Sequence, residues 1–360
     1  MTSTPSSPAP AVVVLAAGHG TRMRSPLPKV LHPICGRPMV AWTARAALGA
    51  AADRVIVVAG PGADLAPHVP DAVIVATQPE ARGTGDAVRC AAEHLDADRP
   101  VVVLAGDVPM VTAATVTDLV AAHTRARAAL TVLTMRLDEP AGYGRVVRDE
   151  RGDVLRVVET KQPGDATAAE LAIDEVNTGV LCFDGGALLA TLPALKPDNA
   201  QGELYLSDTP ALLRAAGHRI AAHETGDAAV CLGVNDQADL VAVRAVAQAR
   251  ILDAHLRAGV TIVEPATTVI DADVRIGPGT VVEPGCQLEG ATVVGAGCRV
   301  GPHATLRSAR LGDRVSVLHS VLEDCAVEDD AAVGPFAHLR SGVTPPSAAR
   351  GPRAARRPGP

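Results

Sequence analysis

The sequence is poor in aromatic residues, which make up 1% of its 360 positions. A hydrophobic core must therefore be built from Ala, Val, Leu and Ile, and the 48% hydrophobic content is ample for one. No run of 18 apolar residues occurs, so we expect no membrane-spanning helix and no membrane partner. The first ten residues, MTSTPSSPAP, have neither the basic nor the apolar segment of a signal peptide, and we expect them to be disordered.

The seven cysteines are scattered and include no C-x-x-C pair, which argues against a disulfide framework or a zinc site. Reduced thiols of this kind are typical of the cytoplasm. The formal charge of -7 argues against a general nucleic-acid-binding surface. Any phosphate site must therefore be a local basic pocket.

Such a pocket is indicated by LAAGHGTRMRSPLPKVLH, residues 15–32. The stretch follows a β-branched run, AVVV at residues 11–14, which predicts a buried strand. Gly18 and Gly20 lack side chains and let backbone N–H groups approach a phosphate closely. Three cations follow the glycines: Arg22, Arg24 and Lys29.

Two commoner explanations of a glycine-rich turn fit poorly. The dinucleotide-binding fingerprint G-x-G-x-x-G would require a third glycine where the chain has Met23, and no G-K-[ST] of a P-loop follows. A turn that serves only tight packing remains the alternative to a loop that binds a triphosphate.

Downstream, short apolar runs alternate with longer amphipathic stretches, the order expected of a parallel α/β sheet. We expect helices at 38–48, 113–126 and 237–257, and strands at 54–60, 72–76, 101–105, 130–136 and 228–232.

Three polar side chains stand at positions where such a sheet binds ligands. The Gln78 amide can read a donor and an acceptor on a base, and the following Gly83-Thr84 opens a helix. Asp107 lies just past the carboxyl end of the 101–105 strand, where it could bind Mg²⁺ or cap the next helix. Read alone, Asn235 is a helix N-cap.

A β-hairpin is predicted next, with a turn at residues 142–144 and Gly152 at its tip. Its second arm leads to Glu159, and Asn177 lies in the following apolar run. The glycines could serve hairpin geometry alone.

From Ile270 onward, aliphatic residues recur every six positions, with two slips in the spacing. This pattern is typical of a left-handed parallel β-helix, in which stacked coils bury the repeated aliphatics. The series is Ile270, Ile276, Val282, Leu288, Val294, Val300, Leu306, Leu311, Val317, Val321, Val327, Val333 and Leu339. Cys286, Cys298 and Cys325 stand in register with small residues, and we expect them to fill the core.

These motifs carry a resemblance. The signature L-A-A-G-x-G-T-R-M…P-K resembles that of the sugar-1-phosphate nucleotidyltransferases. With PKVLH, the Q…GTG element and the hexads, residues 11 to 340 most closely resemble the bifunctional N-acetylglucosamine-1-phosphate uridyltransferase/glucosamine-1-phosphate acetyltransferase family.

The resemblance implies an α/β fold: a Rossmann-like nucleotidyltransferase domain followed by a partial left-handed parallel β-helix. We assign residues 11–235 to the first domain, 236–260 to a connecting helix, 261–340 to the β-helix and 341–360 to a disordered tail. The implied reaction transfers uridylyl from UTP to N-acetylglucosamine 1-phosphate, giving UDP-N-acetylglucosamine for the cell envelope, and pyrophosphate.

The resemblance also implies roles for individual residues. Lys29 and Arg22 would be catalytic, and Asp107 and Asn235 would hold Mg²⁺. The implied substrate-binding residues are Leu15, Ala16, Ala17, Gly18, Gly20, Lys29, Gln78, Gly83, Thr84, Gly144, Glu159, Asn177 and Asn235. The family usually has His where this chain has Asp86.

In the resembled family the β-helix continues further and carries the catalytic His of acetyl transfer, so we expect that activity to be absent from this chain. The resembled family forms homotrimers through the β-helix, and four coils with an open end could form the same homotrimer, associate only weakly or aggregate. Two alternatives remain open at this stage: a nucleotidyltransferase for another sugar or base, and an inactive scaffold that only trimerises.

Overall fold

The computed structural model describes residues 8–18, 20–160, 164–197 and 202–341. The expected disordered ends lie mostly outside these ranges. The chain divides into two compact units, one built from residues up to His32 and Pro38–Val243, the other from Pro33–Arg37 and residues from Arg244 onward. The sequence motifs gave no indication that Pro33–Arg37 packs with the second unit. Among the described helices, none combines the length and the apolar character needed to cross a bilayer.

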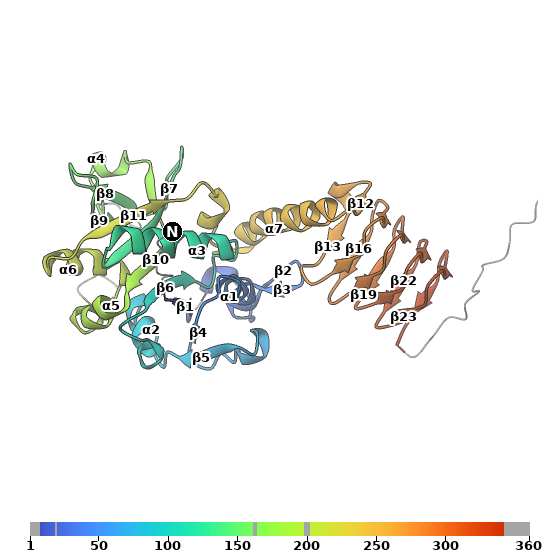
Figure 1. Cartoon of the computed structure of the whole chain (residues 1–360), viewed down its shortest axis with the longest axis horizontal. Helices are drawn as coiled ribbons and strands as arrows, with labels where there is room; N and C mark the ends of the chain where they lie inside the picture. The colour runs from blue at the N-terminus through green and yellow to red at the C-terminus, as the bar shows by residue number, and fades with distance from the viewer. Residues whose placement is uncertain (1–7, 19, 161–163, 198–201, 342–360) are drawn as a thin grey trace, which may run out of the picture. The chain divides into compact units, whose positions relative to one another are not determined.

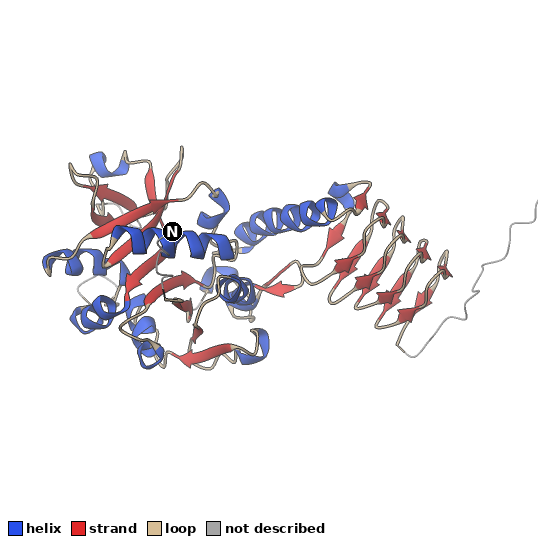
Figure 2. Cartoon of the chain, viewed as in Figure 1, coloured by secondary structure: helices blue, strands red, loops and turns tan. Residues whose placement is uncertain are grey.

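A mostly parallel sheet forms the centre of the first unit, in the order β11-β7-β10-β6-β1-β4-β5 (Figures 1 and 2). Only β10 runs antiparallel to its neighbours in that order. The strands are β1 (Ala11–Ala16), β4 (Arg54–Ala59), β5 (Val73–Thr77), β6 (Pro100–Ala105), β7 (Leu130–Arg136), β10 (Glu175–Asp184) and β11 (Ile220–Glu224).

Helices cover both faces of this sheet because its strands are apolar on both sides. Val12 and Val14 pack with α1 and α3, whereas Val13 packs with α2, α5 and α6, as the two-residue period of a strand requires. The helices are α1 (Met39–Gly49), α2 (Thr84–Cys90), α3 (Ala113–Ala126), α4 (Ala168–Leu171), α5 (Gly185–Thr191) and α6 (Thr209–Ala215). Short 3₁₀ turns connect several elements: η1 (Thr21–Met23), η2 (Lys29–Leu31), η3 (Ala66–His68), η4 (Ala92–His94), η5 (Leu192–Ala194), η6 (Leu206–Asp208) and η7 (Ala228–Cys231).

Two local expectations can be compared with these elements. The predicted hairpin is present as β8 (Arg145–Arg148) and β9 (Val154–Val158), and β8 pairs with β10. The strand expected at 228–232 is wrong. The Asp227 carboxylate accepts a hydrogen bond from the Ala229 N–H at 3.1 Å and caps the 3₁₀ turn η7 there instead.

The chain reverses its direction of travel across the sheet between β1 and β6. From β1 the chain proceeds outward through β4 and β5, and then β6 returns to the other side of β1. In open α/β sheets, ligands bind at such a switch point, outside the carboxyl ends of the strands. The glycine-rich stretch after β1 and Asp107 after β6 both lie at this position.

The second unit is a β-helix preceded by α7 (Gln237–Arg257). Its short strands stack in three parallel sheets, ordered β12-β15-β18-β21-β24, β13-β16-β19-β22-β25 and β14-β17-β20-β23. The strands are β12 (Thr261–Ile262), β13 (Val269–Ile270), β14 (Arg275–Ile276), β15 (Val281–Val282), β16 (Gln287–Glu289), β17 (Val293–Val294), β18 (Arg299–Val300), β19 (Thr305–Arg307), β20 (Arg310–Leu311), β21 (Ser316–Val317), β22 (Val321–Glu323), β23 (Ala326–Val327), β24 (Ala332–Val333) and β25 (His338–Leu339). A two-stranded ribbon of β2 (Pro33–Ile34) and β3 (Arg37–Pro38), together with the turn η8 (Pro265–Thr267), completes the described elements.

The hexad series is correct at all but one position. Leu322 pairs with Leu306 and is fully buried, whereas Val321 pairs with Thr305 and is only partly buried. The core position of this hexad is therefore Leu322 and not Val321. The error arose because both adjacent residues are aliphatic, so residue type alone does not distinguish them. The three β-helix cysteines are buried core residues, as predicted.

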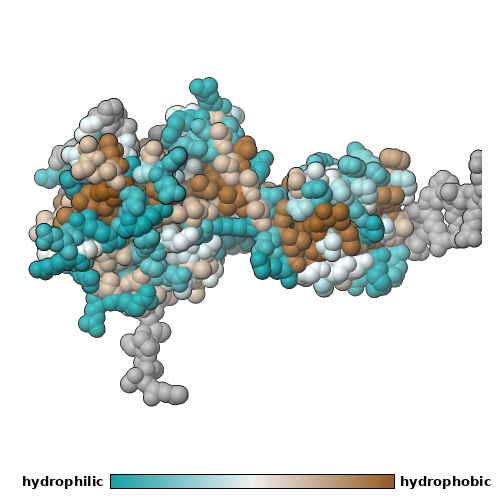
Figure 3. All heavy atoms as spheres, turned by 90° about the horizontal axis from the view of Figure 1, so that it is seen from above, coloured by the Kyte–Doolittle hydropathy of each residue, from teal (hydrophilic) through white to brown (hydrophobic). Residues whose placement is uncertain are grey.

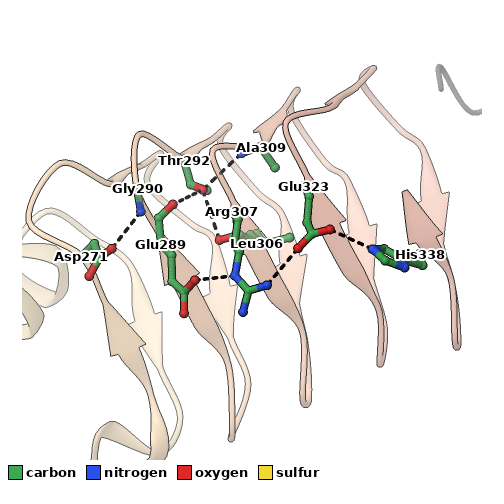
Figure 4. Close-up of polar contacts among 9 residues, drawn as sticks. All are labelled: Asp271, Glu289, Gly290, Thr292, Leu306, Arg307, Ala309, Glu323 and His338. Atoms are coloured by element: carbon green, nitrogen blue, oxygen red, sulfur yellow. Dashed lines mark hydrogen bonds and ion pairs between the residues drawn. The ribbon is translucent and has the colours of Figure 1, made fainter. Parts of the chain in front are cut away.

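Polar side chains also join successive coils of the β-helix (Figure 4). Arg307 donates to Glu289 at 2.6 Å and to Glu323 at 2.8 Å, so one side chain bridges three coils. The buried Thr292 hydroxyl donates to the Glu289 carbonyl at 2.7 Å and accepts from the Ala309 N–H at 3.3 Å. The hydroxyl is thus an acceptor for the Ala309 N–H, and it adds a second donor to the Glu289 carbonyl, which also accepts from the Ser308 N–H at 3.1 Å.

Candidate active site

The loop after β1 folds back so that Lys29 lies against Gly20. Gly20 adopts a left-handed φ of 59°, and a Cβ built there would lie 2.4 Å from the Lys29 Cβ. A residue with a side chain cannot fit without moving the lysine. Gly20 thus serves the close approach of Lys29, which begins η2.

Asp107 lies directly opposite Lys29. The Gly106 N–H donates to the Leu15 carbonyl at 2.8 Å, which holds the end of β6 against the end of β1. The Lys29 ammonium then forms an ion pair with the Asp107 carboxylate, and the two side chains are 12% and 27% exposed. The alternative role of Asp107 as a helix cap is filled by Thr112, whose hydroxyl accepts from the Thr115 N–H at the start of α3.

Asn235 is held near Asp107 by a backbone hydrogen bond of the preceding residue, Val234. The Val234 N–H donates to the Asp107 carbonyl at 2.9 Å, and Arg22 Nη2 donates to Asn235 Oδ1 at 2.8 Å. The helix-cap interpretation of Asn235 does not hold, because Asp236 accepts from the first N–H groups of α7.

The donor set suits a hard divalent cation. Asp107 supplies a carboxylate oxygen and Asn235 an amide oxygen. Lys29 pairs with the first and Arg22 donates to the second, so each oxygen already interacts with a positively charged side chain. Within the described ranges, no three His, Cys, Asp or Glu side chains cluster as a closed metal site. A metal held by few protein oxygens, with waters and substrate phosphates as the other ligands, is how Mg²⁺ commonly binds.

A cavity of about 400 Å³ opens at the same place. Eight of the predicted site residues line it: Leu15, Ala17, Gly18, Lys29, Gln78, Gly83, Thr84 and Asp107. Ala16, by contrast, is a buried strand residue. Glu203 also lines the cavity, and no sequence signal identified it.

Arg22 belongs to a second hollow, of about 560 Å³, together with Arg24 and Asp236. The Arg22–Asn235 hydrogen bond connects this basic hollow with the Asp107 loop through Val234. Four groups predicted from distant parts of the sequence are thus linked: Lys29, Asp107, Arg22 and Asn235.

The predicted sugar-binding residues form a separate group on β8, β9 and β10. The Asn177 N–H donates to the Gly144 carbonyl at 2.9 Å, and a Cβ at Gly144 would lie 3.5 Å from the Val158 carbonyl, next to Glu159. These three residues do not line the 400 Å³ cavity. Their contact with a sugar therefore stays a prediction.

A parallel α/β sheet with a basic glycine loop and an acidic residue at its switch point defines the class of nucleotidyltransferases. Residues 12–171 match the model of the MobA-like NTP transferase domain, and residues 273–308 match the bacterial transferase hexapeptide (six repeats). The fold and the site thus indicate the same class of enzyme, a nucleotidyltransferase, as the match to the NTP transferase domain.

Curated relatives narrow the class further. The bifunctional protein GlmU of Corynebacterium glutamicum is 45% identical over 93% of this chain and 70% of its own length. GlmU of Kineococcus radiotolerans is 48% identical over 95% of this chain and 70% of its own length. GlmU of Brevibacillus brevis is 45% identical over 92% of this chain and 71% of its own length.

The chain belongs to the GlmU family. It is a UDP-N-acetylglucosamine pyrophosphorylase, a nucleotidyltransferase that depends on a divalent metal, and its second unit is the hexapeptide β-helix of that family.

Proposed function

We propose that the cavity at the carboxyl ends of β1 and β6 binds UTP and that uridylyl is transferred there to N-acetylglucosamine 1-phosphate. The observation that carries the proposal is the meeting of Lys29, Asp107 and the Gln78 amide in one cavity at the switch point. A cation, a metal ligand and a base-reading amide are the three groups that a nucleoside triphosphate needs.

The reaction requires no general base. A phosphate oxygen of the sugar phosphate is already an anion, so it attacks the α-phosphorus directly. The new P–O bond forms as the bond to the β-phosphate breaks, and pyrophosphate leaves with that electron pair. Catalysis therefore consists of positioning the two phosphates in line and neutralising the charge on them.

Lys29 and Arg22 supply the fixed positive charge in this proposal. Asp107 and Asn235 would hold Mg²⁺, which would neutralise phosphate charge when bound. Lys29 and Arg22 contact those two oxygens in the structure, so a metal held there would compete with both cations for the oxygen lone pairs. Their ammonium and guanidinium groups would then be shared between these oxygens and the phosphates of the nucleotide.

The sugar end of the substrate would lie against β8, β9 and β10. We assign the N-acetylglucosamine ring to Gly144, Glu159 and Asn177. Polar groups of this kind allow a site to reject sugars that lack the matching donor or acceptor.

We further propose that the β-helix assembles the protein into a homotrimer and that the enzyme works in the cytoplasm. Apolar surface is visible over the β-helix unit in Figure 3. Among the exposed large hydrophobic residues of this unit are Val263, Leu318 and Phe336. The six described cysteines are all free, which fits a reducing compartment. Light scattering on the purified protein measures the assembly directly.

Release of pyrophosphate tests the proposed function. Purified protein with Mg²⁺, UTP and N-acetylglucosamine 1-phosphate should release pyrophosphate, and a reaction without the sugar phosphate should not. A panel of dTTP, CTP, ATP and GTP measures the base preference. No release above the sugar-free control would overturn the proposal.

A further inference from the structure

The side-chain amide of Gln78 is held in one orientation by two neighbours. Gln78 Nε2 donates to the Gly83 carbonyl at 3.1 Å and to Asp86 Oδ2 at 2.9 Å. Gln78 and Asp86 are 2% and 4% exposed, so water competes little for these bonds. Both hydrogens of the amide nitrogen are therefore committed within the protein.

A flipped amide is excluded by the chemistry of these neighbours. A backbone carbonyl and an ionised carboxylate only accept hydrogen bonds. Reversal of the amide would point Gln78 Oε1 at two other oxygens, one of them charged, and would leave Nε2 without either partner. Oε1 is consequently the atom of Gln78 that remains for a ligand in the cavity, which Gln78 lines.

The two neighbours are themselves fixed in place. A Cβ at Gly83 would lie 2.6 Å from the Leu204 carbonyl oxygen, so the backbone there has no room to shift. Arg82 Nη2 lies 3.3 Å from Asp86 Oδ1 and its Nε 3.5 Å from Oδ2. The arginine thus pairs with the buried carboxylate and orients it.

We propose that Asp86 is a positioning residue that sets base specificity, by making Gln78 a hydrogen-bond acceptor toward the base. The inference rests on the proposed binding of UTP in this cavity. An acceptor matches a base with a ring N–H, as uracil and thymine have at N3. Cytosine presents an acceptor at the same ring position, and the two lone pairs would face each other. The His that the resembled family usually carries at this position can donate or accept, whereas a carboxylate fixes the choice.

The experiment measures binding of UTP and CTP to the full chain by calorimetry, with Mg²⁺ and without sugar phosphate. The test variant is Asp86→Asn, which removes the charge from one of the two acceptors of Gln78 Nε2 and can present an NH₂ group there, so that only the Gly83 carbonyl still favours the original amide orientation. We expect the preference for UTP over CTP to fall about tenfold, the scale of one hydrogen bond to a charged group. The preference is a ratio from one preparation, so a partly unfolded sample does not distort it.

Two further variants make the test specific. Glu80→Gln is the matched control, because Glu80 also pairs with Arg82, at 3.8 Å, but its side chain is 73% exposed and is not among the hydrogen-bond partners of the Gln78 amide nitrogen. It should keep the wild-type preference. Asp86→His should show the wild-type preference at pH 8, where neutral imidazole accepts, and lose it at pH 5.5, where both ring nitrogens donate.

The outcomes separate this inference from the proposed function. A preference that stays within twofold of wild type in Asp86→Asn, or that falls equally in Glu80→Gln, overturns the role of Asp86. Wild-type protein that binds UTP no better than CTP overturns it as well. Selective binding of UTP without pyrophosphate release would contradict the proposed function alone.

Discussion

Replacing Lys29 with alanine should change catalysis and metal binding in opposite directions. The ammonium of Lys29 is paired with Asp107, the proposed metal ligand, in the absence of metal. The same group is proposed to neutralise phosphate during transfer. One side chain therefore competes with the metal in the free enzyme and assists the reaction in the complex.

The expected magnitudes follow from the surroundings of this pair. Loss of a preorganised group that stabilises transition-state charge costs about 3–4 kcal/mol, so kcat/KM should fall about 10²–10³-fold. The Lys29 and Asp107 side chains are 12% and 27% exposed, so water partly screens their attraction. Breaking such a pair costs about 1 kcal/mol, and without it the metal should bind about fivefold more tightly.

Two assays and one control variant check this prediction. Pyrophosphate release gives kcat/KM, and calorimetric titration with Mn²⁺, without nucleotide, gives the metal affinity. Lys196→Ala removes an exposed lysine elsewhere on the same unit and should leave both quantities unchanged. Near-normal turnover in Lys29→Ala, or weaker metal binding, would refute the reasoning.

Two predictions concern stability. Thr292→Val should lower the free energy of unfolding by about 1–3 kcal/mol, because it keeps the volume but removes the hydroxyl that accepts from the buried Ala309 N–H; in denaturant titrations the exposed substitution Arg307→Gln should cost less, and an equal cost would contradict the argument. Arg148→Met should destabilise the first unit by about 3 kcal/mol at pH 7, because Glu175, only 3% exposed, loses its two hydrogen bonds at 2.6 and 2.8 Å. Burial, the largest single effect, would raise the pKa of Glu175, but the hydrogen bonds that its carboxylate accepts and the positive charges of Arg148 and Arg136 together outweigh burial, so the pKa lies below its ordinary value. The stabilisation is thus present above the ordinary pKa of about 4.3 and is lost as the pH falls through the lowered one, so the difference between variant and wild type should shrink near pH 4. A difference independent of pH would show that the carboxylate is not its source.

The parts of the site that sequence could predict depend on local rules. Gly20, before Lys29, is required by backbone geometry, and the hexads are required by a core to which each face of every coil adds one aliphatic residue. Asp107 could be placed because the end of an apolar strand is visible in the sequence. Each of these signals lies within about ten neighbouring residues.

The parts that could not be predicted depend on long-range packing. Cys35 contacts Gln248 across more than two hundred residues, which brings Pro33–Arg37 into the second unit, and no periodicity records such a pairing. The role of Asp86 depends on which atoms of Gln78 it contacts, and residue type alone does not specify that. The choice between Val321 and Leu322 likewise required the register of the stacked coils.

The backbone explains why groups from three distant segments act at one place. The Gly106 N–H binds the Leu15 carbonyl, and the Val234 N–H binds the carbonyl of Asp107, so the scaffold joins all three loops before any ligand arrives. Lys29 pairs with Asp107, and Arg22 donates to Asn235, whose N–H donates to the Asp239 carboxylate at 2.8 Å. A divalent metal alone would compete with these two cations for its oxygens, and a triphosphate alone finds one of its two cations already in an ion pair. When metal and nucleotide are both present, the metal can interact with the Asp107 and Asn235 oxygens and the phosphates with Lys29 and Arg22. The geometry therefore favours binding of the metal and the nucleotide as a unit.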